Sequence, residues 1–485
     1  MQEMKRSTIL YLLVSVLAAS CTKDITSLNN NSKASTSVPS SSLFLNGEKN
    51  LSDALAGTSV YATPFRVLAQ SWTENTYVSE AQYNLTIDNS PQGWWNELYA
   101  SGTASVLNSL ADAKTIIPTD ITDTAAQKNA LLITDILEVY AYSLLVNTYG
   151  NVPYSQALNS KIPFPAYDDA KTIYYDLLAR LDTAIAGLNT NGLSFGASDI
   201  IYQGNVTEWK KFAATLKLKL AMVIADVDPS TAGTKIREAV NAGVFTSNND
   251  NALFVYSSAI TTNSNPVYQA FISRHDFSPA DLIIDTLVSW SDPRLPLMFT
   301  QINGGYAGGV PGAGNGYVRF SQFSSQWLDA AWPGDLLDYA ETEFLLAEAA
   351  ERGFAVTGTA ATHYSNGVTA SINFWGADSA AAATYLAQPS VAYATAAGTW
   401  KQKIGWQQWL AYADRGWDAW TSIRRLGYPN IDAINPPVGA VSNLPRRFTY
   451  PAAEETTNPT NWAAAVQAVT GGASDGVQYD LWWNK

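Results

Sequence analysis

The sequence predicts a mostly α-helical protein in which pairs of helices form a scaffold that carries long irregular loops, with little β-structure. Three observations support this fold class. Apolar residues recur at helical spacing through most of the chain, and strand-like runs are few. Segments rich in Gly, Pro, Asn and aromatic residues separate the helices.

The helices can be placed in chain order from their apolar spacing and end signals. The strongest pattern covers about residues 126–148 and ends at Tyr149-Gly150, after which Pro153 blocks continuation. Asp168 is expected to open a second helix that runs to about Leu188. Further helices are expected over Thr207–Ile224, Leu336–Phe354, Ala360–Trp375 and Thr399–Ala413.

Two stretches, about 126–226 and 336–376, have helix pairs that resemble tetratricopeptide units of irregular spacing. The clearest strand-like pieces are Leu253–Tyr256 and Tyr317–Phe320. The long insertions cover residues 248–279, 292–333 and 428–460. Because loops on a rigid scaffold commonly carry recognition, we expect binding residues in these insertions.

The N-terminus has the pattern of an export signal followed by a lipidation site. Lys5 and Arg6 precede a short apolar run, which ends in small residues before Cys21. We therefore expect residues 1–20 to be a signal peptide and Cys21, the only cysteine, to carry lipid as in a bacterial lipobox. The usual large aliphatic residue three before the cysteine is replaced by Ala18. An ordinary secreted protein with a spare thiol is the alternative.

The polar composition of residues 21–50 predicts a flexible tether between lipid and fold. The folded domain is then expected over residues 51–485. Beyond the signal, no run approaches the 18 consecutive apolar residues of a spanning helix, so we expect an anchored protein rather than a spanning one.

The composition limits the kinds of molecule that the protein can be expected to bind. The formal net charge of −13 makes nucleic acid an improbable partner, because phosphate backbones repel an acidic surface. The chain has 16 Trp, 25 Tyr and 16 Phe but only two His. Such rings form cores, and they also offer flat apolar surfaces to sugars or peptides.

Enzyme motifs are weak. Gly192–Gly196 fits the nucleophile-elbow pattern around Ser194, with His275 and His363 downstream, but it follows a helix rather than a strand. Zinc-site spacings and phosphate-binding loops are missing from the sequence, so we expect no catalytic residue, no metal and no cofactor. A glycosidase carboxylate pair has no recognisable spacing and stays open as an alternative.

Several blocks in a fixed order resemble the SusD/RagB-like nutrient-binding lipoproteins of Bacteroidetes outer membranes. These blocks extend over nearly the whole chain after the signal: Asn147–Tyr154, Pro165–Asp168, Ile201–Asn205, Trp209–Leu218, Asp292–Arg294, Tyr339–Ala349, Gly367–Ser371, Trp420–Pro429 and Pro445–Glu454. The resemblance implies a single large SusD-like domain at the cell surface. It also implies binding of oligosaccharides, or sometimes peptides, and delivery to a SusC-like TonB-dependent transporter.

The family's binding face generally draws on the segment after the first helix and on loops in the middle of the chain, here about 72–99 and 248–333. Both regions are rich in aromatic residues, and Tyr306 and Trp327 flank a segment with seven glycines that is hard to bury. We expect Trp72 and Trp327 to stack on the ligand. The other expected contacts are Glu74, Asn75, Tyr77, Tyr83, Trp94, Trp95, Tyr306, Tyr317 and Arg319, with Asn84 and Asn315 as further polar groups. For each ring, a place in the core is the alternative.

Overall fold

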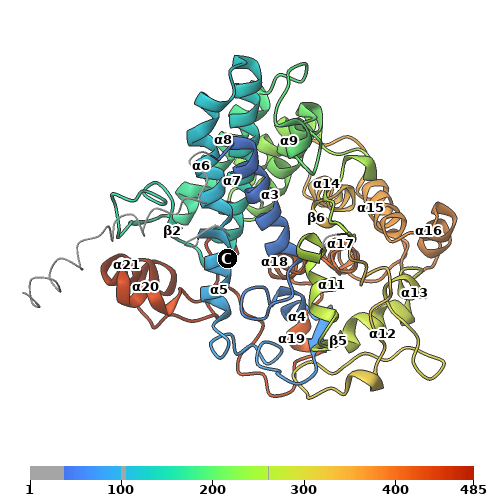
Figure 1. The fold of residues 1–485 in the computed structure, drawn as a ribbon. Coiled ribbons are helices and arrows are strands. Elements are labelled where there is room, and N and C mark those ends of the chain that lie inside the picture. The colour runs from blue at the N-terminus through green and yellow to red at the C-terminus, as the bar shows by residue number, and fades with distance from the viewer. Residues whose placement is uncertain (1–37, 100–104, 260, 485) are drawn as a thin grey trace, which may run out of the picture. The chain divides into compact units, whose positions relative to one another are not determined.

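The computed structural model describes residues 38–99, 105–259 and 261–484, and within them a single folded unit begins at Ser40 (Figure 1). The predicted signal peptide and Cys21 lie outside the described residues. The predicted tether is too long, because helix α3 (Ser40–Ala56) covers residues 40–50. The serine-rich composition concealed the apolar spacing of Phe44, Leu51 and Ala54, which are all buried on this helix.

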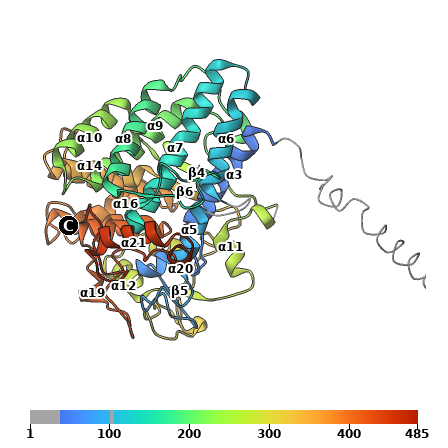
Figure 2. The same cartoon turned by 90° about the vertical axis from the view of Figure 1, so that its left-hand side faces the viewer.

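A layer of helices packed one against the next occupies the upper part of Figures 1 and 2. Each helix in this layer contacts its neighbour in the chain, and α3 packs across α6. These helices are α6 (Val106–Asp120), α7 (Thr124–Tyr149), α8 (Ala170–Gly187), α9 (Val206–Val223) and α10 (Pro229–Ala242). The arrangement confirms the predicted helical scaffold.

Helix α7 lies at the centre of this layer. By length and composition it is the one described helix that could cross a membrane, yet 83% of its most apolar window is buried inside the protein. Asp123 caps its first turn by accepting from the Ala126 amide, and Gly150 ends it with a φ of 94°, as the turn motif predicts. We therefore assign α7 as a core helix.

A second group of helices packs in the same way nearer the C-terminus. It consists of α14 (Tyr339–Glu351), α15 (Ala360–Phe374), α16 (Ser379–Leu386), α17 (Trp400–Ala411) and α18 (Gly416–Leu426). Here α14 contacts α15 and α17, and α17 contacts α18. The predicted pairing of helices around 336–376 is confirmed.

Two predicted helix boundaries and one predicted strand are wrong, each for a local reason. Asp169, not Asp168, caps α8, because Asp168 pairs with Val152 in a two-residue bridge between β2 (Val152–Pro153) and β3 (Tyr167–Asp168). Residues 334–337 form strand β6 rather than the start of a helix, and α14 begins only after its cap, Asp338. The predicted strand at 317–320 is a single helical turn, in which the Arg319 amide donates to the Gly316 carbonyl.

Short elements and loops make up the lower part of Figure 1. Two antiparallel strand pairs join distant parts of the chain, β1 with β5 and β4 with β6. The elements of this region and of the C-terminus are α4 (Phe65–Leu68), β1 (Trp72–Glu74), α5 (Ser90–Tyr99), β4 (Ala252–Phe254), α11 (Pro266–Phe271), β5 (Phe277–Pro279), α12 (Asp281–Ser289), α13 (Leu295–Met298), β6 (Gly334–Leu337), α19 (Ile431–Ile434), α20 (Ala452–Thr457) and α21 (Pro459–Thr470), with short turns at η1 (Gly196–Ser198), η2 (Asn248–Asp250), η3 (Thr261–Asn263) and η4 (Tyr317–Arg319).

A buried ionic network fastens the two helical groups together. Arg415 forms ion pairs with Asp338 (3.3 Å) and Glu341 (2.6 Å) of the α14 region and with Asp418 (2.8 Å) of α18. Lys219, from α9, reaches Glu341 and Asp418 from the other side. All five side chains are buried. The network therefore connects α9, α14 and α18 inside the core.

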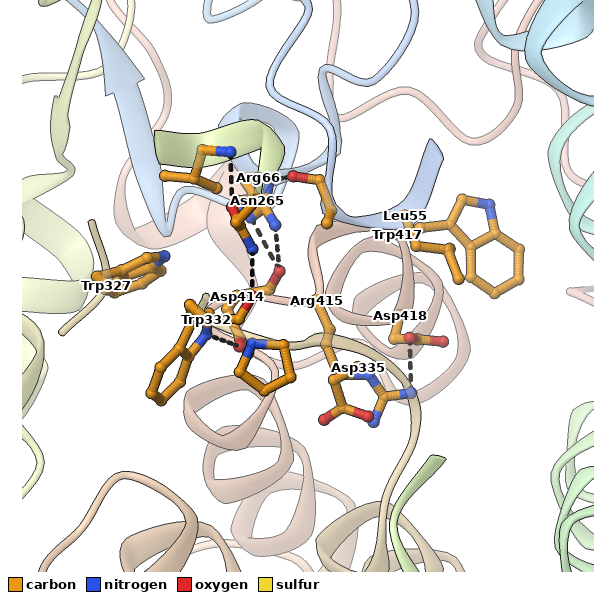
Figure 3. Close-up of a pocket in the computed structure, with 13 residues that line it drawn as sticks. Leu55, Arg66, Asn265, Trp327, Trp332, Asp335, Asp414, Arg415, Trp417 and Asp418 are labelled. Atoms are coloured by element: carbon orange, nitrogen blue, oxygen red, sulfur yellow. Dashed lines mark hydrogen bonds and ion pairs between the residues drawn. The ribbon is translucent and has the colours of Figure 1, made fainter. Parts of the chain in front are cut away.

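A water-sized cavity of about 20 Å³ lies beside this network, and Figure 3 shows Asp335, Asp414 and Arg415 around it. Neither carboxylate oxygen of Asp335 has a hydrogen-bond partner in the described structure. Burial raises the pKa of Asp335 well above its usual value, against the pull of Arg415. The raised pKa favours the neutral form of Asp335, beside a network that already buries several carboxylates.

We predict that Arg415→Ala lowers the free energy of unfolding by about 3–5 kcal/mol, because it leaves buried carboxylates without a counter-charge. Arg446→Ala is the matched control, because its ion pair with Asp480 is exposed, and it should cost no more than about 1 kcal/mol. Urea unfolding followed by circular dichroism measures both. Equal losses in the two variants would contradict the assigned role of Arg415.

Candidate functional site

A group of exposed and half-buried aromatic side chains gathers where four separate loops meet. We call it the aromatic platform, and it consists of Tyr61, Tyr77, His275 and Tyr317 together with Arg274. The side chains of Tyr61 and Tyr77 are 62% and 65% exposed. The rings of His275 and Tyr317 stack with centroids 4.2 Å apart at 21°. Stacked and exposed rings of this kind offer flat apolar faces to a ligand.

Arg274 lies near both Tyr61 and Tyr77 and directly precedes His275 in the sequence. Its pKa lies above the usual value, chiefly because it hydrogen-bonds and pairs with Asp276, and also because the phenol groups of Tyr77 and Tyr61 lie near it. The guanidinium is exposed to solvent. The platform thus combines aromatic faces with a fork of hydrogen-bond donors.

Two buried asparagines hold together three of these loops, those of Tyr77, His275 and Tyr317. Asn75 donates from its amide to the His275 carbonyl (2.7 Å) and accepts from the Ser278 hydroxyl (2.9 Å). Asn315 donates to the Glu74 carbonyl (2.8 Å), and its backbone amide donates to the Asn75 carbonyl (2.8 Å). These bonds extend the β1–β5 pairing into the loop of Tyr317. Asn75 and Asn315, expected as ligand contacts, instead position the platform.

The glycine-rich loop before Tyr317 packs backbone against backbone. A Cβ at Gly308 would lie 2.4 Å from the Asp281 backbone, and one at Gly312 would lie 2.2 Å from the Val438 carbonyl oxygen. Gly312 also has a φ of 76°, which favours glycine. The loop is therefore fixed against α12 and the 438 loop, and it supports η4 and Tyr317 above it.

The prediction that Trp72 and Trp327 stack on a ligand at the surface is wrong, because both rings are buried. Trp72 is 1% exposed and Trp327 is 0% exposed. Their rings contact each other at 5.9 Å, and Phe323 packs against both. The seven-glycine segment near Trp327 does not keep it at the surface, because Phe299 and Trp375 close around its ring.

Most other expected contacts are also buried. Trp94 packs edge-on against Phe65, Trp95 packs against Tyr149, and Tyr83 is 2% exposed. Glu74 is buried as well, and its carboxylate accepts from the Ala81 amide (2.9 Å). These side chains support the site from within rather than line it.

Of the expected residues, five keep solvent access. Tyr77 and Tyr317 belong to the platform, and Arg319 is exposed in the turn that carries Tyr317. Tyr306 is half-buried and packs against the core. Asn84 is half-buried and accepts from the Thr86 hydroxyl.

Sequence reasoning missed Tyr61, Arg274 and His275 as members of a site. One signal in the sequence could have indicated Arg274 and His275. They belong to the polar run Ser273–Asp276 inside a long insertion, and such a run has no role in a hydrophobic core. Their assembly depends on the β1–β5 pairing, which joins residues some 200 positions apart.

The nucleophile-elbow hypothesis gains no support from the geometry. Ser194 lies in a turn between α8 and η1, and its hydroxyl donates to the Gly204 carbonyl (3.0 Å). His363 is bound between Glu343 and the Thr357 carbonyl, whereas His275 belongs to the platform. In the described part of the chain, no three His, Cys, Asp or Glu side chains gather as a metal site would require.

Comparison with known proteins gives a consistent family match. A SusD-like family model, described as "Starch-binding associating with outer membrane", matches residues 30–451. The chain is similar to a solved chitin-binding protein at 28% identity and TM-score 0.77, covering 92% of this chain and 99% of that chain.

Two further solved structures resemble the chain over nearly their full length. A chitin-binding SusD homologue from Flavobacterium johnsoniae is 25% identical with TM-score 0.78, covering 92% of this chain and 98% of that one. A SusD homologue from Bacteroides uniformis is 26% identical with TM-score 0.76, covering 91% and 99%. No curated protein sequence matches the chain.

Beneath the platform, the buried carboxyl groups of Glu74 and Glu80 predict a pH dependence. Burial raises the pKa of Glu74 to about 9 and that of Glu80 to about 7, with Asp88 adding repulsion to both. An unfolded glutamate has a pKa of about 4.3, so the contribution of these groups to stability is fully present below about pH 4.3. It is lost as the pH rises from there to about 7 for Glu80 and to about 9 for Glu74.

We expect the unfolding free energy of the wild type to fall across this window, and Glu74→Gln/Glu80→Gln to flatten the fall. Denaturant unfolding in steps from about pH 4 to about pH 10 measures it. Identical pH profiles for the two proteins would show that the carboxyl pair is not the titrating element.

Proposed function

The chain belongs to the SusD-like family, and we propose that it captures oligosaccharides or polysaccharides at the cell surface and delivers them to a SusC-like TonB-dependent transporter. The observation that carries the proposal is the aromatic platform of Tyr61, Tyr77, His275 and Tyr317, with Arg274 at its side. We propose binding without catalysis, so the platform holds the glycan and leaves its bonds intact.

The chemistry of a sugar fits such a surface. One face of a pyranose ring presents C–H groups, which pack on an aromatic ring, and its rim presents hydroxyl groups that need hydrogen-bond partners. Tyr77 and Tyr317 supply rings, and Arg274 and Arg319 supply exposed donors. The starch-binding description of the family and the chitin-binding names of two similar structures support a polysaccharide ligand.

The platform should be pre-organised rather than formed on binding. The asparagine bonds and the aromatic contacts beneath it leave few groups to be ordered by a ligand. Pre-organisation reduces the entropy lost on binding, so a few exposed rings can hold a polymer that passes over the surface.

We predict that Tyr77→Ala and Tyr317→Ala each weaken polysaccharide binding at least about tenfold, as expected for rings that stack directly on the ligand. Neither change should lower the free energy of unfolding by more than about 1 kcal/mol, because both rings have solvent access. Affinity electrophoresis in gels containing starch or chitin oligomers, together with denaturant unfolding, measures the two quantities.

Trp327→Ala is the contrasting control. Its ring is fully buried, so the change should lower the free energy of unfolding by about 3–5 kcal/mol. If Tyr77→Ala and Tyr317→Ala together left the affinity for every tested polysaccharide unchanged, the platform would be excluded as the binding face.

We also propose that Cys21 carries the lipid that attaches the protein to the outer membrane. Cys21→Ala should therefore release the mature protein into the soluble fraction, since the anchor supplies the membrane affinity. Fractionation of cells expressing each form measures this. Retention of Cys21→Ala in the membrane at the wild-type level would contradict the anchor.

A transporter partner is the final part of the proposal, because a tethered binding protein has no route of its own across a membrane. Isolation of the tagged protein from gently solubilised native membranes should recover a TonB-dependent β-barrel in comparable amount. Recovery of the protein alone under the same conditions would count against delivery to such a partner.

A further inference from the structure

A second pocket, which shares no residue with the aromatic platform, opens beside the C-terminal group of helices. It has a volume of about 270 Å³ and lies between the end of α12, helices α15 and α17 and the loop 390–397. Its walls include Trp290, Tyr364, Ser390, Gln402, Lys403 and Trp406. These elements converge in the right-hand half of Figure 1.

Two partly exposed tryptophans form a corner in this pocket. The rings of Trp290 and Trp406 lie 5.7 Å apart at 68°, so one ring presents its edge to the other. Trp406 is supported from below by Trp409 at 5.6 Å and 83°. Trp290 packs at the junction of the two hydrophobic clusters of the protein. Both rings are therefore fixed while part of their surface stays open.

The wall opposite the tryptophans is fastened by hydrogen bonds. The Tyr364 hydroxyl donates to the Val391 carbonyl (2.7 Å), and the Lys403 ammonium donates to the Tyr393 carbonyl (2.8 Å). Below them, the Gln407 amide donates to the Tyr385 hydroxyl (2.8 Å). The loop 390–397 is thus held against α15 and α17, and the pocket is formed without a ligand.

Polar groups surround the mouth of the pocket. Ser390 is exposed, and Gln402 and Lys403 are half-buried. None of the residues that line the pocket is a carboxylate, and one is a cation, although the chain as a whole is acidic. The pocket therefore presents apolar ring faces inside and hydroxyl, amide and ammonium groups at its edge.

We propose that this pocket is a second saccharide site, which takes a single pyranose ring of a neutral or acidic sugar. Its volume is just below the roughly 300–1,000 Å³ of ordinary small-molecule pockets, which suits one ring rather than a chain segment. The tryptophan corner receives the C–H face of the ring, and Ser390, Gln402 and Lys403 receive its hydroxyl groups. The inference rests on the proposed glycan capture for the class of ligand.

The experiment uses saturation-transfer NMR with four sugars: glucose, galactose, N-acetylglucosamine and glucuronic acid. The lipid-free mature protein is compared with the platform variant Tyr77→Ala/Tyr317→Ala, in which the platform is altered and the second pocket stays intact. We expect at least one sugar to bind the platform variant with millimolar affinity. If none of the four gives a signal with the platform variant, the second site is excluded.

Three changes in the platform variant then locate the site. Trp406→Ala should weaken the sugar at least about tenfold, as expected for a stacking ring. Gln402→Ala, at the edge of the pocket, should weaken it about two- to tenfold with the fold unchanged. Trp400→Ala is the matched control, because Trp400 is a half-buried tryptophan on the same helix outside the pocket.

The outcomes separate this inference from the proposed function. If Trp406→Ala folds and binds as tightly as the platform variant, or if it does not fold and Gln402→Ala has no effect, the second site is wrong. If sugars bind the wild type and the platform variant equally while Trp406→Ala removes binding, the second site stands and the platform fails.

Discussion

The rest of the structure depends most directly on the ion pairs of the buried Arg415 side chain. This side chain joins the cap of α14 to the first turn of α18, and with Lys219 it brings α9 to the same point. Burying several charges is costly unless every group is paired, so this arrangement tolerates few geometries. The raised pKa of Asp335 beside it has the same cause, since burial disfavours a further anion whose oxygens have no hydrogen-bond partner.

A series of aromatic contacts connects the helical core to the aromatic platform. Near the helices, Trp375 contacts Trp327, and Trp327 contacts Trp72. Phe271 packs against Trp72 and meets His275 edge-on at 6.4 Å. The outermost ring, Tyr317, stacks on His275. The tryptophans therefore lie beneath the platform, and the smaller rings reach its surface. A large core behind a shallow platform suits the proposed capture of a long polymer, which such a surface would hold without enclosing.

The two regions that the sequence predicts for binding supply part of the aromatic platform, although most of the residues chosen within them are buried. The segments 72–99 and 248–333 do supply Tyr77, His275 and Tyr317, because loops on a helical scaffold are where binding groups collect. Aromatic density and the family resemblance predict Trp72 as a stacking ring with Tyr77 beside it, but only Tyr77 is exposed. Nothing in the local sequence of β1 shows that Phe277 and Phe323, from far along the chain, cover Trp72.

The sequence by itself determined the helices α7, α8, α9, α14, α15 and α17, their order and the family, because apolar spacing and capping residues act within a few turns of the chain. Asp123, Asn205 and Gly150 mark helix ends through contacts with their own neighbours. Only the tertiary structure decided which aromatic rings are covered and which face solvent. The exposure of a ring depends on partners hundreds of positions away, and here the β1–β5 pairing and the bonds of Asn75 and Asn315 bring those partners together.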